Sequence, residues 1–134
     1  MKLNPYILFS GNAEEAYTLY ASVFGGEILQ VSRFGDSPMP CDESEKNKIM
    51  HARLQFGDNL IMFSDGRKED ASADGYIQLS VEIDSLEAIN TIFEKMSEGG
   101  IIIMPLQDMF WGARFGMLQD KFGINWMFNH TLQQ

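Results

Sequence analysis

Hydrophobic and polar positions follow the same order in the two halves of the chain. The run Tyr6-Ile7-Leu8-Phe9-Ser10 begins the first half, and Tyr76-Ile77-Gln78-Leu79-Ser80 begins the second, seventy positions later. Each run is rich in β-prone residues and precedes a stretch with apolar residues at helical spacing, over residues 13–24 and 85–97. Self-similarity of this kind predicts two related structural modules.

Short signals mark the ends of both predicted helices. Asn12 and Asp84, each followed by a glutamate three residues later, predict N-caps. The glycine pairs Gly25-Gly26 and Gly99-Gly100 predict left-handed C-caps. The two helices therefore occupy corresponding places in the two halves.

The remaining hydrophobic runs predict three more strands in each half. They cover residues 27–34, 49–56 and 59–64 in the first half, and residues 101–105, 113–119 and 125–130 in the second. Both halves therefore have the element order β-α-β-β-β. The stretch 35–48, which carries glycine, prolines and mixed charge, predicts a long loop, and the polar stretch 65–74 predicts a linker.

This order predicts an α+β fold in a single domain over residues 1–134, built of module 1 (about 1–68) and module 2 (about 75–134). One helix covers only one face of a four-stranded sheet, so the other face must be buried by the second module or line a cleft. We expect the modules to form a curved, eight-stranded mixed sheet with the helices outside and a concave cleft inside. Such a cleft predicts the binding of a small molecule.

Side chains alternate between the two faces of a strand, which sorts each strand into core and cleft positions. On strand 49–56, His51, Arg53 and Gln55 alternate with apolar residues, so we expect these polar side chains in the cleft. The other residues predicted to face the cleft come from the first and last strands of each module: Tyr6, Leu8, Ser10, Asn59, Ile61, Phe63, Tyr76, Gln78, Ser80, Asn125, Met127 and Asn129.

Composition narrows the class of protein. Hydrophobic residues make up 45% of the chain and charged residues 22%, which is typical of a globular domain. No apolar run is long enough to cross a bilayer, so we expect no membrane partner. The formal net charge of −9 repels a polyphosphate and favours a cationic ligand, so we expect no nucleic-acid partner. The single cysteine, Cys41, fits a cytoplasmic protein without disulfides.

Several short motifs are spread over the whole chain. They are Pro5-Tyr6, Gly11-Asn12-Ala13-Glu14-Glu15-Ala16, Met50-His51-Ala52, Asp108-Met109-Phe110-Trp111-Gly112 and Asp120-Lys121-Phe122-Gly123 followed by Trp126. With the doubled layout, they make the chain resemble the vicinal oxygen chelate superfamily of glyoxalase I, bleomycin-resistance proteins and extradiol dioxygenases. Within it the chain is similar to the PhnB-like branch, which often carries a 3-demethylubiquinone methyltransferase name. No glycine-rich nucleotide-binding turn supports that name in this sequence.

The resemblance also implies where a metal would bind. Metal enzymes of the superfamily hold a divalent ion with residues of the first and last strands of the modules, commonly His, Gln and Glu. The matching positions here are Tyr6, Tyr76, Ile61 and Met127. Isoleucine has no donor atom, methionine is a soft thioether, and tyrosine is a poor ligand unless ionised. We therefore expect no site for the usual metal and no cofactor.

Two of the predicted cleft residues have chemistry of their own. Histidine titrates near neutral pH, so His51 is a candidate general base. Arg53, two residues along the same face, is a candidate grip for a carboxylate or phosphate. The alternative is structural: His51 hydrogen bonds to a neighbouring strand, and Arg53 pairs with one of the many acids of this protein.

The resemblance and the predicted faces together give a set of candidate ligand-binding residues: Tyr6, Phe63, Tyr76, Gln78, Trp111, Asn125 and Met127. Trp111 lies in an aromatic segment between two strands, and it either walls the cleft or packs at a module or subunit contact. The loop 35–48 is long enough for a lid or a dimer arm, and the resemblance implies a homodimer.

Two functions of different classes follow. The first is a metal-free small-molecule-binding protein whose ligand the sequence does not identify. The second is a metal-independent isomerase, lyase or hydrolase that uses His51 as general base, with Arg53 beside it. The residues at the metal-ligand positions disfavour a metalloenzyme of the glyoxalase or dioxygenase kind. A purely structural role would require a cleft that is filled by the protein's own side chains.

Overall fold

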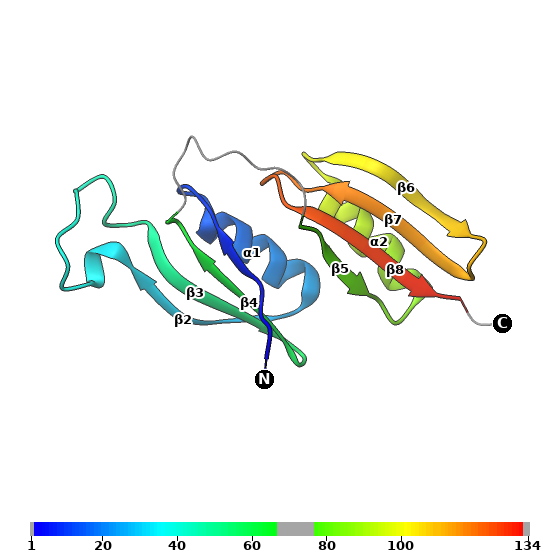
Figure 1. Cartoon of the computed structure of the whole chain (residues 1–134), viewed down its shortest axis with the longest axis horizontal. Coiled ribbons are helices and arrows are strands. Elements are labelled where there is room, and N and C mark those ends of the chain that lie inside the picture. Colours follow the sequence, from blue (N-terminus) through cyan, green and yellow to red (C-terminus); the bar gives the residue numbers. More distant parts are fainter. Residues whose placement is uncertain (1, 67–76, 133–134) are drawn as a thin grey trace. The chain divides into compact units, whose positions relative to one another are not determined.

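Hydrogen bonding divides the strands into two four-stranded sheets with corresponding strand orders (Figure 1). The computed structural model describes residues 2–66 and 77–132. The chain divides into two compact units, residues 1–71 and 72–134, which correspond to modules 1 and 2. Most of the predicted linker, and Tyr76, lie outside the described residues.

Module 1 contains the predicted β-α-β-β-β series. Its elements are β1 (Tyr6–Leu8), α1 (Ala13–Phe24), β2 (Glu27–Arg33), the short 3-10 helix η1 (Phe34–Asp36), β3 (Ile49–Phe56) and β4 (Asn59–Ser64). The strand order is β1-β4-β3-β2. Strand β1 is parallel to β4, and the other pairs are antiparallel. The predicted hairpin across Gly57-Asp58 joins β3 to β4 at the centre of this sheet.

Module 2 repeats the plan. Its elements are β5 (Leu79–Glu82), α2 (Leu86–Ser97), β6 (Ile101–Met109), β7 (Ala113–Gln119) and β8 (Asn125–Thr131). The strand order is β5-β8-β7-β6, with β5 parallel to β8. Strand β6 continues past the predicted end at Pro105, which lies in a register shift on this edge strand. Proline has no N–H to donate, and an edge strand tolerates it for that reason.

The predicted α+β class, with two β-α-β-β-β modules, is confirmed. Within the described residues, the eight strands pair as two four-stranded mixed sheets. The single curved sheet and the concave cleft stay predictions.

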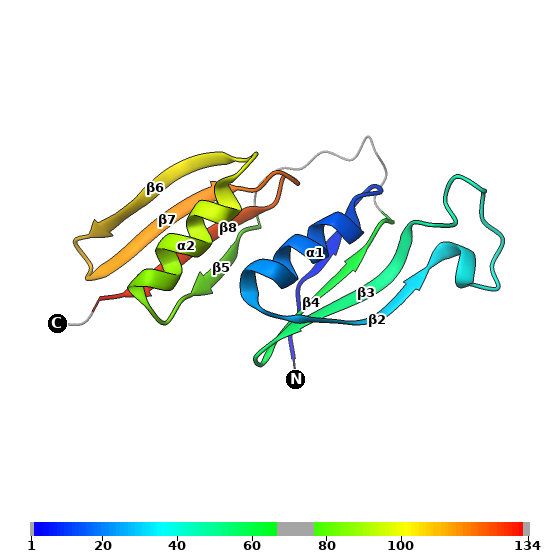
Figure 2. The same cartoon turned by 180° about the vertical axis from the view of Figure 1, so that it is seen from behind.

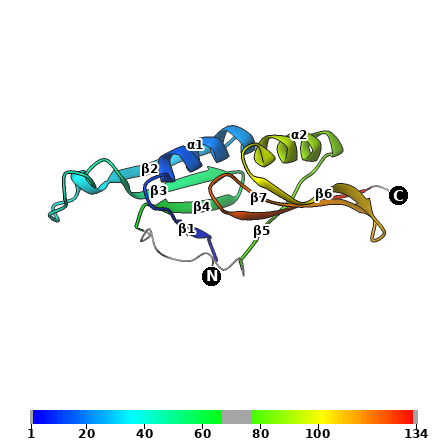
Figure 3. The ribbon, with the colours of Figure 1, turned by 90° about the horizontal axis from the view of Figure 1, so that it is seen from above.

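Each helix packs on one face of the sheet of its own module (Figures 2 and 3). Under α1, the ring of Phe63 from β4 lies 5.9 Å from those of Tyr17 and Tyr20, and it stacks on Phe9 at 6.1 Å. All four of these side chains are buried. The burial of four aromatic rings provides much of the hydrophobic stabilisation of module 1.

The corresponding core of module 2 includes two aromatic residues of β8. Phe128 meets Phe93 of α2 edge to face, with ring centroids 5.9 Å apart, and stacks with Trp126. The indole Nε1 of Trp126 donates to Oδ2 of Asp120 at 2.9 Å, so its one polar atom is satisfied in the core. Trp126 and Phe128, which alternate with the predicted cleft residues Asn125, Met127 and Asn129, are both buried.

One of the two predicted N-caps is wrong. Asn12 is the N-cap residue of α1, as predicted, but its side chain makes no capping hydrogen bond. In module 2 the cap is Ser85, whose hydroxyl accepts from the N–H of Ala88 at 3.0 Å, and Asp84 lies one residue too early. A serine beside an aspartate offers two caps of similar quality, so the sequence alone does not decide between them.

The glycine pairs do end the helices. Gly25 is the C-cap of α1 with φ 74°, and Gly99, which also has φ 74°, follows the C-cap residue of α2. The second glycine of each pair lies against a neighbouring strand. A Cβ on Gly26 would be 2.8 Å from the carbonyl oxygen of Gln55, and one on Gly100 would clash with that of Gln119. Both modules therefore need a glycine where the helix turns back into the sheet.

The carboxylate of Asp65 joins the start of α1 to the sheet. Its Oδ1 accepts from the N–H groups of Gly11 and Ala13, both at 2.9 Å, and its Oδ2 accepts from that of Ile49 at 2.8 Å. Asp65 is buried and follows β4, so a residue distant in sequence supplies the N-terminal contact that the local sequence lacks.

We predict that Asp65→Ala lowers the free energy of unfolding by about 2–4 kcal/mol, because three N–H groups, two of them in buried hydrogen bonds, lose their acceptor. Asp65→Asn should cost less, since it keeps one carbonyl oxygen. Urea unfolding followed by circular dichroism measures both, with exposed Asp42→Ala as the matched control. An Asp65→Ala variant as stable as Asp42→Ala would contradict this role.

Candidate functional site

The face of the module 1 sheet that α1 does not cover is the first part of the candidate site. Cross-strand partners lie on the same face of a sheet, and the register pairs Tyr6 and Arg53 with Met62, and Gln55 with Leu60. We call this surface the open face of module 1; it consists of Tyr6, Leu8, His51, Arg53, Gln55, Leu60 and Met62. As predicted, the polar residues of β3 lie on the opposite face from its core residues, since Ala52 and Leu54 between them are buried. Their place in a cleft stays a prediction.

The prediction that Phe63 lies on the ligand side is wrong. Phe63 is fully buried under α1, and Ile61 points to the same core. Strand β4 reads Leu60-Ile61-Met62-Phe63, which is apolar on both faces, so alternation cannot tell which residues face the helix. The register instead places Leu60 and Met62 on the open face, and sequence reasoning missed both.

Tyr6 and His51 form a pair on this face. The phenol oxygen lies 3.1 Å from Nδ1 of the imidazole, and the ring centroids are 5.7 Å apart. The contact joins β1 to β3 across the intervening strand β4. It holds the imidazole in place and leaves the other ring nitrogen, Nε2, without a hydrogen-bond partner among the described residues.

Arg53 is held by an amide. Its Nη1 donates to Oε1 of Gln30 at 3.0 Å. Gln30 lies at an irregularity in β2, where the register with β3 shifts between Leu29 and Ser32, and it has a positive φ of 54°. A bulge of this kind redirects a side chain, and no local sequence pattern announces it. The predicted pairing of Arg53 with an acid is therefore not found among the described residues.

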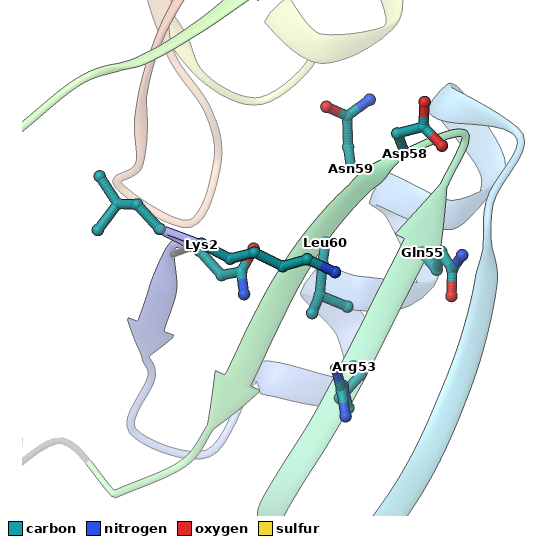
Figure 4. Close-up of a pocket in the computed structure, with 8 residues that line it drawn as sticks. Lys2, Arg53, Gln55, Asp58, Asn59 and Leu60 are labelled. Atoms are coloured by element: carbon teal, nitrogen blue, oxygen red, sulfur yellow. The ribbon is translucent and has the colours of Figure 1, made fainter.

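A hollow of about 420 Å³ lies at the end of this face where the hairpin joins β3 to β4 (Figure 4). The residues that line it are Lys2, Leu3, Asn4, Arg53, Gln55, Asp58, Asn59 and Leu60. The N-terminal segment forms one wall, and the hairpin of β3 and β4 forms the other. The hollow is predominantly polar, and it continues the open face beyond Arg53.

The sheet of module 2 also has a face that its helix, α2, does not cover. The register places Ser80, Met117, Met127 and Asn125 on the side opposite α2. As predicted, Asn125 and Met127 lie on the opposite face from the core residues of β8, since Trp126 and Phe128, on either side of Met127, are buried. The open face of module 2 consists of Ser80, Glu82, Phe115, Met117, Gln119, Asn125, Met127 and Asn129.

Polar contacts organise this second face. Asn129 donates to Oε2 of Glu82 at 2.6 Å, and Thr131 donates to Oε1 through its hydroxyl at 3.0 Å. These hydrogen bonds, that from Asn129 above all, hold the pKa of Glu82 below its ordinary value. Gln119 donates to Asn125 at 3.5 Å, a long contact.

Three candidate ligand residues of module 2 remain. Trp111 lies at the tip between β6 and β7, is half exposed, and meets Phe115 of the open face edge on, with centroids 5.8 Å apart. This contact joins the aromatic tip to the open face of module 2. Gln78 is exposed just before β5, and Tyr76 lies outside the described residues.

Metal-binding chemistry is sparse in the part of the chain that the structure describes. It contains no group of three or more His, Cys, Asp or Glu side chains that could hold an ion. Of the positions that the superfamily's metal enzymes use, Ile61 faces the core under α1, and its neighbours on the open face are Leu60 and Met62. The donor set that remains, a phenol and thioethers, does not suit a hard divalent cation.

Cys41 is exposed in the loop before β3 and makes no disulfide. Its loop is fastened by backbone hydrogen bonds from Phe34 to Lys48 and from Gly35 to Lys46. Among the described residues, none of the helices is both long and apolar enough to span a membrane.

Comparison with known proteins agrees with this architecture. A family model described as 3-demethylubiquinone-9 3-methyltransferase matches residues 1–128. The solved structure of protein PA1353 from Pseudomonas aeruginosa is 38% identical, with a TM-score of 0.90, and the match covers 99% of each chain. A PhnB protein from Bacillus cereus is 29% identical, with a TM-score of 0.84, over 98% of this chain and 100% of that one.

A third similarity extends to a wider group. A glyoxalase/bleomycin resistance protein/dioxygenase family enzyme from Burkholderia phytofirmans PsJN has a TM-score of 0.66 over 95% of this chain and 97% of its own. At 17% identity this likeness concerns the fold alone.

Proposed function

Because the chain belongs to the family described as 3-demethylubiquinone-9 3-methyltransferase, the PhnB-like branch of the vicinal oxygen chelate superfamily, we propose that it binds a small organic molecule. The ligand lies on a sheet face that the helix of the same module leaves open, and it needs no divalent ion. The resemblance to bleomycin-resistance proteins supports binding without chemistry.

The observation that carries this proposal is the composition of the open face of module 1. A sheet face without a helix over it is ordinarily either covered by another part of the protein or exposed to solvent and polar. Here it combines half-buried apolar side chains, Leu60 and Met62, with a fixed Tyr6–His51 pair and a guanidinium. Apolar area with a few placed polar groups is typical of small-molecule sites.

The proposal that no metal takes part follows from donor chemistry. Glyoxalase-like catalysis needs carboxylate or imidazole ligands at set positions. At the three of these positions that lie within the described residues, this chain has Tyr6, Ile61 and Met127. His51 is the one imidazole on the open face of module 1, and a lone imidazole does not hold zinc or nickel in a protein. An organic ligand therefore has to be bound by contacts with the protein alone.

We predict that a thermal-shift screen of small molecules finds stabilising compounds whose binding Met62→Ala weakens by about tenfold, since a buried methionine contact is worth about 1–3 kcal/mol. Met39→Ala, the same change in an exposed loop residue, is the matched control and should leave the dissociation constant unchanged. EDTA should not alter the shift. The proposal would be contradicted if the compounds bound Met62→Ala and Met39→Ala with equally reduced affinity. A loss of binding to the unmodified protein on addition of EDTA would also contradict it.

A metal-independent enzyme is the second candidate, and the Tyr6–His51 contact favours it. If Nδ1–H donates to the phenol oxygen, Nε2 keeps its lone pair and can accept a proton from a bound substrate. Tyr6 would then fix the tautomer and the direction of the ring, as the orienting partner of a general base does. An isomerase, lyase or hydrolase step that begins with proton removal fits this arrangement, with Arg53 facing the developing negative charge.

If turnover of a screened substrate is found, His51→Ala should lower kcat by at least about 100-fold while the fold is preserved. The matched control is His130→Ala, because Nδ1 of His130 donates to the carbonyl of Ile83 and the ring serves the structure of β8. A rate unchanged in His51→Ala, with or without an effect of His130→Ala, would exclude the catalytic role.

We further propose that the protein is a cytoplasmic homodimer. The resemblance supports a dimer, and edge strand β6 presents Ile101, Ile102 and Ile103, each half exposed or more. An exposed apolar edge strand is a ready surface for pairing with an identical copy. Cys41, exposed and unpaired, is compatible with a reducing compartment.

Sedimentation velocity should show a dimer for the unmodified chain and a monomer for Ile102→Lys, because a buried ammonium would disrupt an apolar contact. Ile77→Lys places the same charge at another exposed isoleucine of module 2 and should leave the dimer intact. A monomeric unmodified chain, or a dimer in all three proteins, would contradict this assembly.

A further inference from the structure

Arg53 differs from the other arginines that the structure describes. Arg33 forms an ion pair with Glu14 at 2.9 Å, and Arg114 forms one with Asp108 at 3.2 Å. Arg53 has no carboxylate partner among the described residues, and its one hydrogen bond goes to the neutral amide of Gln30. In a chain with 19 acidic and 10 basic side chains, a partly buried arginine without a carboxylate partner among the described residues is unusual.

The partner of Arg53 is held in an unfavourable backbone conformation. Gln30 is the one non-glycine residue with positive φ in the described part of the chain. It lies at the bulge of β2, so the strain of the backbone brings its amide to Nη1 of Arg53. Strained residues at bulges are common beside functional groups, which they hold in one orientation. Nε and Nη2 of Arg53 remain available as a two-pronged donor.

A second cation faces the same hollow. Lys2 extends across β4 over Leu60 toward β3, where Arg53 lies (Figure 4). Asn59 and Gln55 add neutral hydrogen-bonding groups. Asp58 is the one carboxylate among the lining residues, and it lies at the turn between β3 and β4. The lining therefore carries two positive charges and one negative charge.

We propose that this hollow binds the oxyanion group, a carboxylate or a phosphate, of the small molecule that the open face of module 1 holds; the inference rests on the proposed function. Arg53 grips two oxygens with its Nε and Nη2 edge, and Lys2 closes over the group from the N-terminal segment. The rest of the ligand then lies along Leu60 and Met62 toward Tyr6 and His51. Gln30 is a positioning residue that fixes the guanidinium.

The net charge of −9 does not oppose this binding at close range. At physiological ionic strength the field of distant surface charges is screened over about 8 Å. A guanidinium in direct contact with an oxyanion is screened much less, because the two charges are only a few ångströms apart, well within that length. The acidic surface therefore slows the approach of an anion more than it weakens the bound state.

Three small probes with the same ring test this site: benzoate, phenyl phosphate and the neutral benzamide. NMR titrations follow the Nε–Hε group of Arg53 and the methyl group of Met62. We expect at least one of the two anions to bind about tenfold more tightly than benzamide, and Arg53→Gln to remove the difference, because hydrogen bonds to a charged group are stronger than those to a neutral one. The anion that binds better identifies the group as carboxylate or phosphate, and equal binding means that both are accepted.

Two variants make the test specific. Arg33→Gln removes an arginine that pairs with Glu14 of α1, and it should leave anion binding unchanged. Gln30→Gly relieves the positive φ and removes the amide, so it should weaken anion binding several-fold without lowering the urea midpoint. A purely structural Gln30 would instead change stability and leave binding unaffected.

Benzamide binding as tightly as both anions while Met62 still responds would overturn the anion site and leave the proposed function intact. An equal loss of affinity in Arg53→Gln and Arg33→Gln would overturn it as well. If none of the three probes moves Met62 or Arg53, the anion site is wrong, and the comparison of Met62→Ala with Met39→Ala decides the proposed function separately.

Discussion

A single α-helix is about 10 Å across, while four strands spaced about 4.8 Å apart make a wider surface, so one helix can bury only one face of each sheet. This constraint governs both modules of the chain. Aromatic residues of α1 and β4, and of α2 and β8, fill the covered faces. The opposite faces are left for other contacts, and the candidate functional groups lie on these faces or at their edges.

Hydrogen bonds that hold each helix or turn to its sheet also fix the strands whose other side forms the open face. Asp65 ties the start of α1 to β3, and Asp120 ties the turn after β7 to the indole of Trp126. With β3 fixed, its alternate residues His51 and Arg53 have a set direction. The contact of His51 with Tyr6 and that of Arg53 with Gln30 then orient the two side chains across the sheet. The buried carboxylate of Asp65, which is not part of the site, thus contributes to the order of the open face of module 1.

Sequence patterns are informative where one face of a strand is polar and misleading where both faces are apolar. On β3 the alternation predicts the outward direction of His51, and on β8 that of Met127. On β4 both faces are apolar, so alternation assigns Phe63 to the wrong side. The cap supplied by Asp65 and the bulge at Gln30 depend on contacts between distant segments, which local spacing does not encode.

The most direct test of ligand binding on the open faces uses the methionine methyl groups as NMR probes. Met62 and Met127 lie on the open faces, Met96 is on the buried side of α2, and Met39 is in an exposed loop. On titration with a stabilising compound, we predict that the resonances of Met62 or Met127 shift saturably while those of Met96 and Met39 do not. Saturable shifts confined to Met96 or Met39 would contradict the central claim.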